Sequence, residues 1–128
     1  MNNVVLDASA VMAVLNQEAG ADKLPPGLLE LAVSSAVNLA EVQSKLVERG
    51  VPPDAAWRAS RNCVREVVSF TAEHARAAGG LIAQTRAWGL SLGDRACLAL
   101  ALSLEAPVYT ADRSWKNLKI GLRIHLIR

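Results

Sequence analysis

The chain has 128 residues, 52% of them hydrophobic, and its 14 basic and 12 acidic residues leave a formal net charge of +2. This length predicts one domain over residues 1–128, and the charge is too close to neutral to indicate nucleic-acid binding by composition alone. The longest apolar run of the C-terminal half, Ala96 to Leu102, is far shorter than the roughly 18 residues that a membrane span requires. No secretory pattern follows Met1, so we expect a cytoplasmic protein with no membrane partner.

The N-terminal segment combines an apolar run with a single acid. Val4 to Leu6 is followed at once by Asp7, and Ser9 to Leu15 is again almost wholly apolar. This pattern predicts a buried parallel strand, a turn and a helix. Asp7 then lies at the carboxyl end of the strand, which is where such sheets bind ligands.

Strand and helix patterns alternate through the rest of the chain. After a mobile surface segment over 16–27, with a short helix over 21–24 that Pro25, Pro26 and Gly27 stop, we predict a strand over 31–34 and helices over 36–50 and 54–65. Next we predict a strand over 66–70 and a helix from Thr71 through Ala87, in which Gly79 and Gly80 mark a bend or close packing. The last predicted elements are a buried helix over 92–104, a strand over 107–110 and an edge strand over 122–127. Strands separated by helices predict an α/β fold of three layers, with a central parallel sheet of four to five strands flanked by helices.

The two cysteines give no sign of metal or disulfide chemistry. Cys63 and Cys97 each lie inside an apolar helical pattern, without a CxxC pair or a nearby histidine. We therefore predict that both are reduced core residues.

Four acids stand at turns or at the starts of helices: Asp7, Glu41, Asp94 and Asp112. Each has an ordinary structural explanation. Asp7 can cap the following helix, the Asn38–Glu41 and Ser91–Asp94 pairs have the spacing of capping boxes, and Asp112 can begin a turn before Trp115.

Together the four acids predict more than capping. Asp7 and Asp112 directly follow apolar strands, Asp94 opens the buried helix before the second of these strands, and Glu41 lies one turn into a helix that follows a strand. All four should therefore meet at one edge of the sheet. Converging carboxylates raise one another's pKa unless a cation lies among them, and hard oxygen ligands without His or Cys suit Mg²⁺ or Mn²⁺.

The segments around these acids resemble a PIN domain. They read Val-Val-Leu-Asp-Ala-Ser-Ala, Asn-Leu-Ala-Glu-Val, Leu-Ser-Leu-Gly-Asp-Arg-Ala and Val-Tyr-Thr-Ala-Asp-Arg-Ser-Trp. Their order, spacing and total length are similar to those of the VapC toxins of VapBC toxin–antitoxin pairs. Trp115 stands where these proteins often have Phe, and Gly93 where many have Ala, and we expect neither change to touch a metal ligand.

The resemblance implies a metal-dependent endoribonuclease. It assigns Asp7, Glu41, Asp94 and Asp112 to the acidic metal site, with Ser9 and Thr110 as accessory polar residues. Divalent ions suit phosphodiester hydrolysis because they activate a water and neutralise developing charge, so no protein nucleophile is needed. The implied partners are RNA, a VapB-like antitoxin whose basic tail occupies the acidic cleft, and a second copy of the chain in a homodimer.

Other polar and aromatic residues admit two interpretations. Arg95, Arg113 and Lys116 adjoin the acidic motifs and either bind RNA phosphates or form local ion pairs. Trp57, Trp88 and Trp115 either stack on unpaired bases or, as we favour, pack in the core and at helix ends. His74 and His125 fall away from the acids, and we expect no catalytic role for them.

The acidic residues of the chain distinguish this function from other functions of α/β domains. A haloacid-dehalogenase-type phosphotransferase needs a second Asp where Ser9 stands, and a receiver domain needs paired acids that this chain lacks. A non-catalytic RNA-binding or assembly module would usually miss one of the four acids. A housekeeping RNA-processing nuclease would use identical chemistry, and only an antitoxin-like reading frame next to the gene distinguishes it from a toxin.

Overall fold

The computed structural model describes residues 2–128, in which five short strands form one sheet. The strands are β1 (Val4–Leu6), β2 (Ala32–Ser35), β3 (Glu66–Val68), β4 (Val108–Thr110) and β5 (Ile124–Leu126). Their order is β3-β2-β1-β4-β5, and every neighbouring pair is parallel. The first strand of the chain is thus the central one, and the predicted α/β class with a parallel sheet is confirmed.

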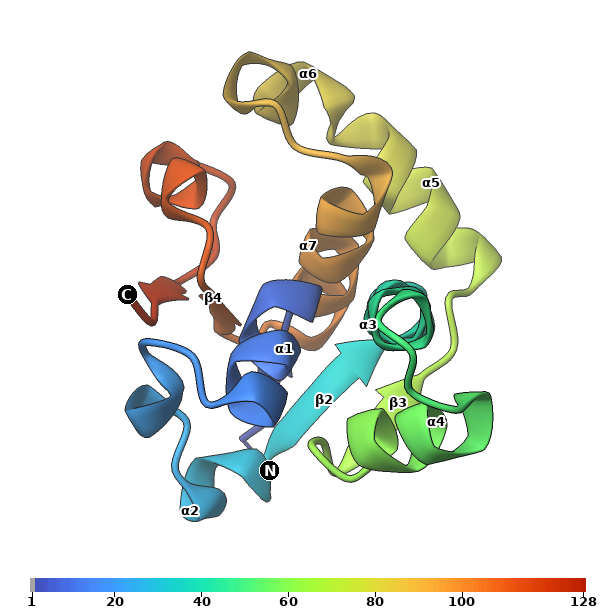
Figure 1. The fold of residues 1–128 in the computed structure, drawn as a ribbon. Coiled ribbons are helices and arrows are strands. Elements are labelled where there is room, and N and C mark those ends of the chain that lie inside the picture. The colour runs from blue at the N-terminus through green and yellow to red at the C-terminus, as the bar shows by residue number, and fades with distance from the viewer. Residues whose placement is uncertain (1) are drawn as a thin grey trace.

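Helices cover both faces of this sheet, as Figure 1 shows. The α-helices are α1 (Ala8–Asn16), α2 (Pro26–Leu29), α3 (Ala36–Glu48), α4 (Pro53–Arg61), α5 (Ala72–Gly80), α6 (Ile82–Thr85) and α7 (Leu92–Leu104). Three short 3₁₀ helices are η1 (Ala21–Lys23), η2 (Arg86–Trp88) and η3 (Arg113–Asn117). None of the helices in residues 2–128 has the length and apolar character needed to cross a membrane.

The alternation of side chains along β1 divides the core in two. Val4 and Leu6 join a buried cluster with residues of α1, α3 and α4. Val5, between them, joins a second cluster with residues of α7 and with Trp115 of η3. Because successive side chains of a strand point to opposite faces, one central strand supports both helical layers. The expected three-layer arrangement follows from this alternation.

Two prolines begin helices that we predicted differently. Pro26 was expected to help stop a helix, but it is the first residue of α2, and Pro53 is the first residue of α4. Proline suits this position because the first N–H of a helix has no intrahelical partner and the ring fixes a helical φ. Helix α4 also ends at Arg61, four residues before the predicted end of this helix at residue 65.

The single helix predicted from Thr71 through Ala87 is wrong. Thr71 does cap a helix, since its hydroxyl accepts a hydrogen bond from the His74 N–H at 3.1 Å, but α5 ends at Gly80 and is followed by α6 and η2. A Cβ added at Gly79 or Gly80 would meet no atom within 4 Å, so close packing does not explain these glycines. The low helix propensity of Gly is the physical reason for the break.

The segment between α1 and β2 packs against the C-terminal end of the described chain. Leu24 is 3% exposed, and Gly20 has a φ of +95° with its Cα directly against the Ile127 backbone. A Cβ at this position would clash with the Ile127 carbonyl oxygen, so only glycine fits. Arg128 also reaches this segment, donating to the Ala19 carbonyl at 3.0 Å.

Candidate active site

Asp7 lies where β1 ends and α1 begins, and its carboxylate is fully engaged. Oδ1 accepts hydrogen bonds from the Ala10 N–H at 2.9 Å and from the Ser9 hydroxyl at 2.7 Å. Oδ2 accepts one from the Thr110 hydroxyl at 2.6 Å. The contact with Ala10 is that of a helix N-cap, so the structural interpretation of Asp7 is correct as far as it goes. It leaves unexplained why a residue that is 3% exposed carries a charge.

The electrostatic environment of Asp7 disfavours its ionised form. Burial raises the pKa of the Asp7 carboxyl from 3.8 to about 6, although the hydrogen bonds from Thr110, Ser9 and Ala10 act in the opposite direction. The charge of Asp94 raises this pKa further. Within residues 2–128 the ion pairs are Arg65–Glu66 and Arg128–Glu18, so no Lys or Arg pairs with Asp7. Asp7 is a buried anion that lacks a counter-charge.

The two residues assigned as accessory connect the ends of β1 and β4. The Thr110 hydroxyl, which donates to Asp7, accepts a hydrogen bond from the Asp112 N–H at 3.0 Å. The Ser9 hydroxyl accepts one from the Ala111 N–H at 2.9 Å. Ser9 and Thr110 therefore hold the Asp7 carboxylate against the backbone that leads to Asp112.

Glu41 and Asp94 approach from two helices that pack together. Asn38 lies on α3 and is 1% exposed, and its amide donates to Glu41 Oε1 at 2.9 Å and to the Gly93 carbonyl of α7 at 3.0 Å. The predicted Asn38–Glu41 capping box is absent, because Ser35 caps α3 instead. The predicted box of Ser91 with Asp94 is present, with bonds of 3.2 Å and 2.9 Å.

The thiol of Cys97 lies within electrostatic range of three of the four acids. This residue of α7 is fully buried, and burial raises the pKa of its thiol well above the ordinary value. The charges of Asp7, Asp94 and Glu41 raise this pKa further. Cys97 and Cys63 are both free and buried, as the sequence predicted.

Asp112 stands apart from the other three acids. Its side chain is exposed, and Oδ1 accepts hydrogen bonds from the Ser114 N–H at 2.9 Å and the Ser114 hydroxyl at 2.8 Å, which caps η3. Only the backbone of Asp112 is linked to the cluster, through Thr110. In the arrangement that the structure describes for residues 2–128, no three His, Cys, Asp or Glu side chains are placed to hold a metal ion together.

The donor set nevertheless suits a hard divalent cation. The groups at this edge of the sheet are carboxylate, hydroxyl and amide oxygens, and among residues 2–128 the buried Oδ1 atom of Asn38 has no hydrogen-bond partner. Such oxygens are the ligands that Mg²⁺ and Mn²⁺ prefer. A cation would also offset the charge of Asp7.

Of the cations next to the acidic motifs, two bind backbone carbonyls. Arg95 donates to the Ala78 carbonyl of α5 at 3.0 Å and Arg113 to the Arg128 carbonyl at 3.0 Å, so neither forms the local ion pair that was one alternative. Lys116 is exposed on η3.

The three tryptophans do not behave alike. Trp115 is fully buried in the core, which agrees with the packing role that we favoured, but Trp57 and Trp88 are 42% and 41% exposed. These two are therefore not core residues. The ring of His125 stacks on Tyr109 at 4.6 Å, and the ring of His74 lies 6.3 Å from Phe70.

The comparisons with known proteins agree with the fold. A model of the PIN domain matches residues 4–121. The structure is similar to a toxin–antitoxin complex from Klebsiella pneumoniae, with a TM-score of 0.75 and 12% identity over 98% of both chains. It is similar to DNA-bound VapBC from Salmonella typhimurium, with a TM-score of 0.75 and 16% identity over 100% of both chains. A third similar structure is VapC20 of Mycobacterium tuberculosis, a sarcin-ricin loop cleaving toxin, with a TM-score of 0.71 and 20% identity over 94% of this chain and 99% of that one. Comparison with curated proteins gave no significant match.

Proposed function

Since this chain belongs to the PIN-domain family, we propose that it is a metal-dependent endoribonuclease toxin of the VapC type, which hydrolyses RNA phosphodiester bonds and is inhibited by a cognate antitoxin. The observation that carries the proposal is the buried Asp7 carboxylate, whose pKa the charge of Asp94 helps to raise and which has no cationic partner in the described part of the chain. A protein keeps such a group against its folding cost when the group serves a ligand.

Four carboxylates would hold the metal: Asp7, Glu41, Asp94 and Asp112. Mg²⁺ or Mn²⁺ bound there would supply an activated water and neutralise the charge that develops on the phosphate. Ser9 and Thr110 hold Asp7, the Asn38 amide holds Glu41, and the Ser91 N–H holds Asp94. These partners orient each carboxylate before a ligand arrives, which is the usual task of the residues behind a metal site. Asp112 joins the set by giving up its bonds to Ser114.

The partners in the proposal follow from the charge of the site and from the neighbours. The similar structures include toxin–antitoxin complexes, and an arginine side chain can bind two carboxylate oxygens at once. An antitoxin tail with Arg or Lys would therefore compete with the metal for Asp7 and Glu41. We further propose that the toxin acts in the cytoplasm, where its RNA substrate lies, and as a homodimer.

A cleavage assay tests the nuclease. The purified protein should cut RNA in Mg²⁺ or Mn²⁺, lose this activity in EDTA, and lose it again when Asp7→Asn is assayed with metal. Asp22→Asn is the matched control, because Asp22 is an exposed acid of η1. Full activity in EDTA would exclude the metal-dependent mechanism. Sequencing the new 5′ ends after brief expression would identify the RNA that is cut.

Co-expression with the product of the adjacent gene tests the toxin role. The partner should co-purify, block cleavage and protect growth, and replacing the basic residue of its tail should abolish this protection. A partner that does none of these leaves a housekeeping RNA-processing nuclease as the remaining assignment.

A further inference from the structure

A small pocket with a strongly basic lining lies beside the acids. It measures about 200 Å³ and is lined by Ser9, Met12, Glu18, Lys45, Arg49 and Arg128. Three of these side chains are cationic and one is anionic. The pocket brings together α1, the end of α3 and the C-terminal end of the described chain, and no sequence motif indicated it.

Ser9 connects this pocket to the candidate active site. Its hydroxyl donates to Asp7 Oδ1 at 2.7 Å, so the wall of the pocket is also a direct partner of the central acid. Lys45 follows Glu41 by four residues, which places both on the same side of α3, about 6 Å apart along the axis, and Arg49 is the C-cap of this helix. The basic pocket thus continues the surface that begins with the acids.

The positive charge of the pocket is not cancelled by its one acid. Glu18 binds Arg128 at 3.1 Å and also accepts a hydrogen bond from the Asn16 amide at 3.0 Å. The Asn16 hydrogen bond, followed by the charges of Arg128 and Arg49, lowers the pKa of Glu18. Lys45 and Arg49 are exposed and form no ion pair in the part of the chain described. Two cations therefore remain available to an incoming anion.

We propose that this pocket binds a backbone phosphate of the RNA strand, next to the phosphate that is cut. The inference rests on the proposed nuclease function and names how the same site holds its substrate. Lys and Arg bind phosphate oxygens by charge-assisted hydrogen bonds, and the pocket suits a small anion rather than a base. The acids, with the metal they would hold, would bind the scissile phosphate, and Lys45 and Arg49 would hold its neighbour, so the strand would be fixed at two points.

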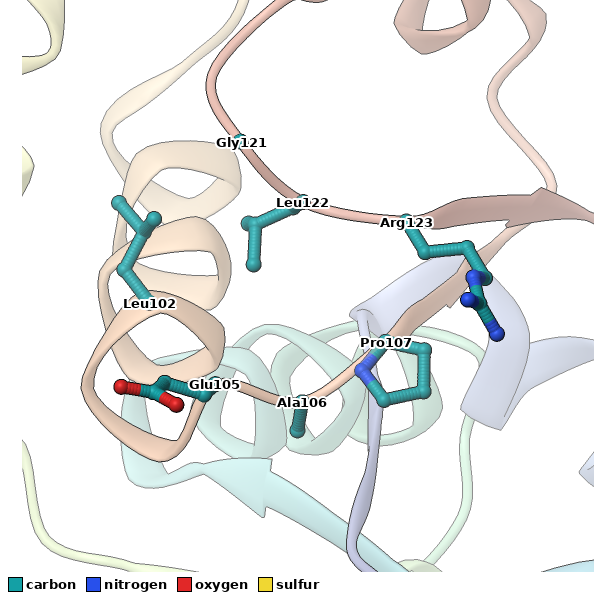
Figure 2. Close-up of a pocket in the computed structure, with 7 residues that line it drawn as sticks. All are labelled: Leu102, Glu105, Ala106, Pro107, Gly121, Leu122 and Arg123. Carbon is teal, nitrogen blue, oxygen red and sulfur yellow. The ribbon is translucent and has the colours of Figure 1, made fainter.

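A second, larger pocket does not compete for this role. Its volume is about 550 Å³, but it lies at the opposite edge of the sheet, where α7 ends and where β4 and β5 begin. Figure 2 shows that the side chains of Glu105 and Arg123 extend in opposite directions there. A ligand site needs polar groups that converge, and these do not.

The test compares two double variants of equal charge. Lys45→Gln with Arg49→Gln removes the pocket cations, and Arg58→Gln with Arg61→Gln removes two exposed cations of α4 outside the pocket. The affinity for a short single-stranded RNA that the wild-type protein cleaves is measured in EDTA at several salt concentrations. The logarithm of the association constant decreases linearly with the logarithm of the salt concentration. For the pocket variant this slope should become less steep by about 0.7 for each phosphate that is no longer bound, and for the α4 variant it should not change. In Mg²⁺ the pocket variant should show a raised KM with kcat largely kept.

Oligonucleotides with one neutral methylphosphonate linkage locate the phosphate that the pocket binds. The wild-type protein should lose affinity at a single position beside the cleavage site, and the pocket variant should not be affected there. Equal salt slopes for the two double variants would overturn the proposal. So would a pocket variant that binds RNA normally but loses the antitoxin, because the pocket would then hold an acidic peptide. A wild-type protein that cleaves no RNA would instead overturn the proposed function itself.

Discussion

The backbone of Gly93 occupies the space next to the Glu41 carboxylate so closely that no side chain fits between them. A Cβ on Gly93 would lie 2.5 Å from Glu41 Oε1 and 2.7 Å from Oε2. Gly93 therefore bears directly on a candidate ligand, which corrects the expectation that its identity leaves the ligands untouched. Glycine here creates room for an acid from another helix.

Gly93→Ala should separate folding from activity. Alanine favours the helix by about 0.5–1 kcal/mol relative to glycine, so α7 should form normally, while the carboxylate of Glu41 has to move away and leave its bond with Asn38. We expect RNA cleavage and Mn²⁺ affinity to fall about tenfold or more with an unchanged melting temperature. Gly79→Ala is the control, because its Cβ meets no atom within 4 Å. Normal activity of Gly93→Ala would show that this close contact does not determine how Glu41 serves the site.

Asp7 should make the metal-free protein less stable as the pH rises. Burial raises its pKa from 3.8 to about 6, so between these values the folded state binds more protons than the unfolded state. The free energy of unfolding then falls as the pH increases through this window, by about 3 kcal/mol in total. Asp7→Asn should remove this decrease and, in EDTA at pH 7, melt higher than the wild type.

Urea unfolding in EDTA at several pH values measures the effect of Asp7, with Asp22→Asn as the exposed control. Asn caps a helix as well as Asp does, so the substitution keeps the contact with Ala10. A marked loss of stability in Asp7→Asn at pH 7 would mean that capping is the main role of this residue.

Thr110→Val should change both stability and the pH dependence of metal binding. The variant removes the donor to Asp7 and leaves the Asp112 N–H without its acceptor, which costs about 1–3 kcal/mol. Because the hydrogen bond that is removed lowers the pKa of Asp7, that pKa should rise further and Mn²⁺ binding should need a higher pH. Thr85→Val is a matched control, since Thr85 is equally buried and donates to the Leu81 carbonyl away from the acids. It should lose stability without any shift in the pH profile.

Asp112 should contribute less to metal affinity than Asp7. Its carboxylate is exposed and already bonded to Ser114, so metal binding has to break these hydrogen bonds. We expect Asp112→Asn to weaken Mn²⁺ binding by less than Asp7→Asn does, as measured by calorimetry on the two variants side by side. A larger loss for Asp112→Asn would place it at the centre of the site.

The sequence predicted those parts of the site that local chemistry determines. The Ser91–Asp94 capping box and the Asp7 cap depend on residues a few positions apart, and both are present. The bridge that Asn38 makes from Glu41 to the Gly93 carbonyl spans 55 residues of sequence, so it depends on the packing of α3 against α7. A polar residue on an apolar helix face, three positions before a candidate ligand, was the one available signal.

The fold was predictable from local patterns for a similar reason. The prediction of the fold fails where two local signals conflict. Apolar runs between helices identified the strands, but their order required the tertiary structure, which places β1 at the centre. A proline such as Pro26 is compatible both with the end of a preceding helix and with the first residue of a following one. Asp112 was placed with the other acids because it follows β4, whereas its hydrogen bonds to Ser114 turn the carboxylate away into η3.

The central position of β1 also determines when the acid site can exist. Asp7 accepts a hydrogen bond from the hydroxyl of Thr110, which lies 103 residues further along the chain. The Asp7 N–H also donates to the Tyr109 carbonyl at 3.3 Å. Contacts between such distant segments form late, because the intervening chain must first be ordered. On the ribosome, a nascent chain therefore carries no complete acid site until β4 has emerged from the exit tunnel. Under the proposed ribonuclease function, the chain would spend most of its own synthesis unable to attack the RNA that surrounds it.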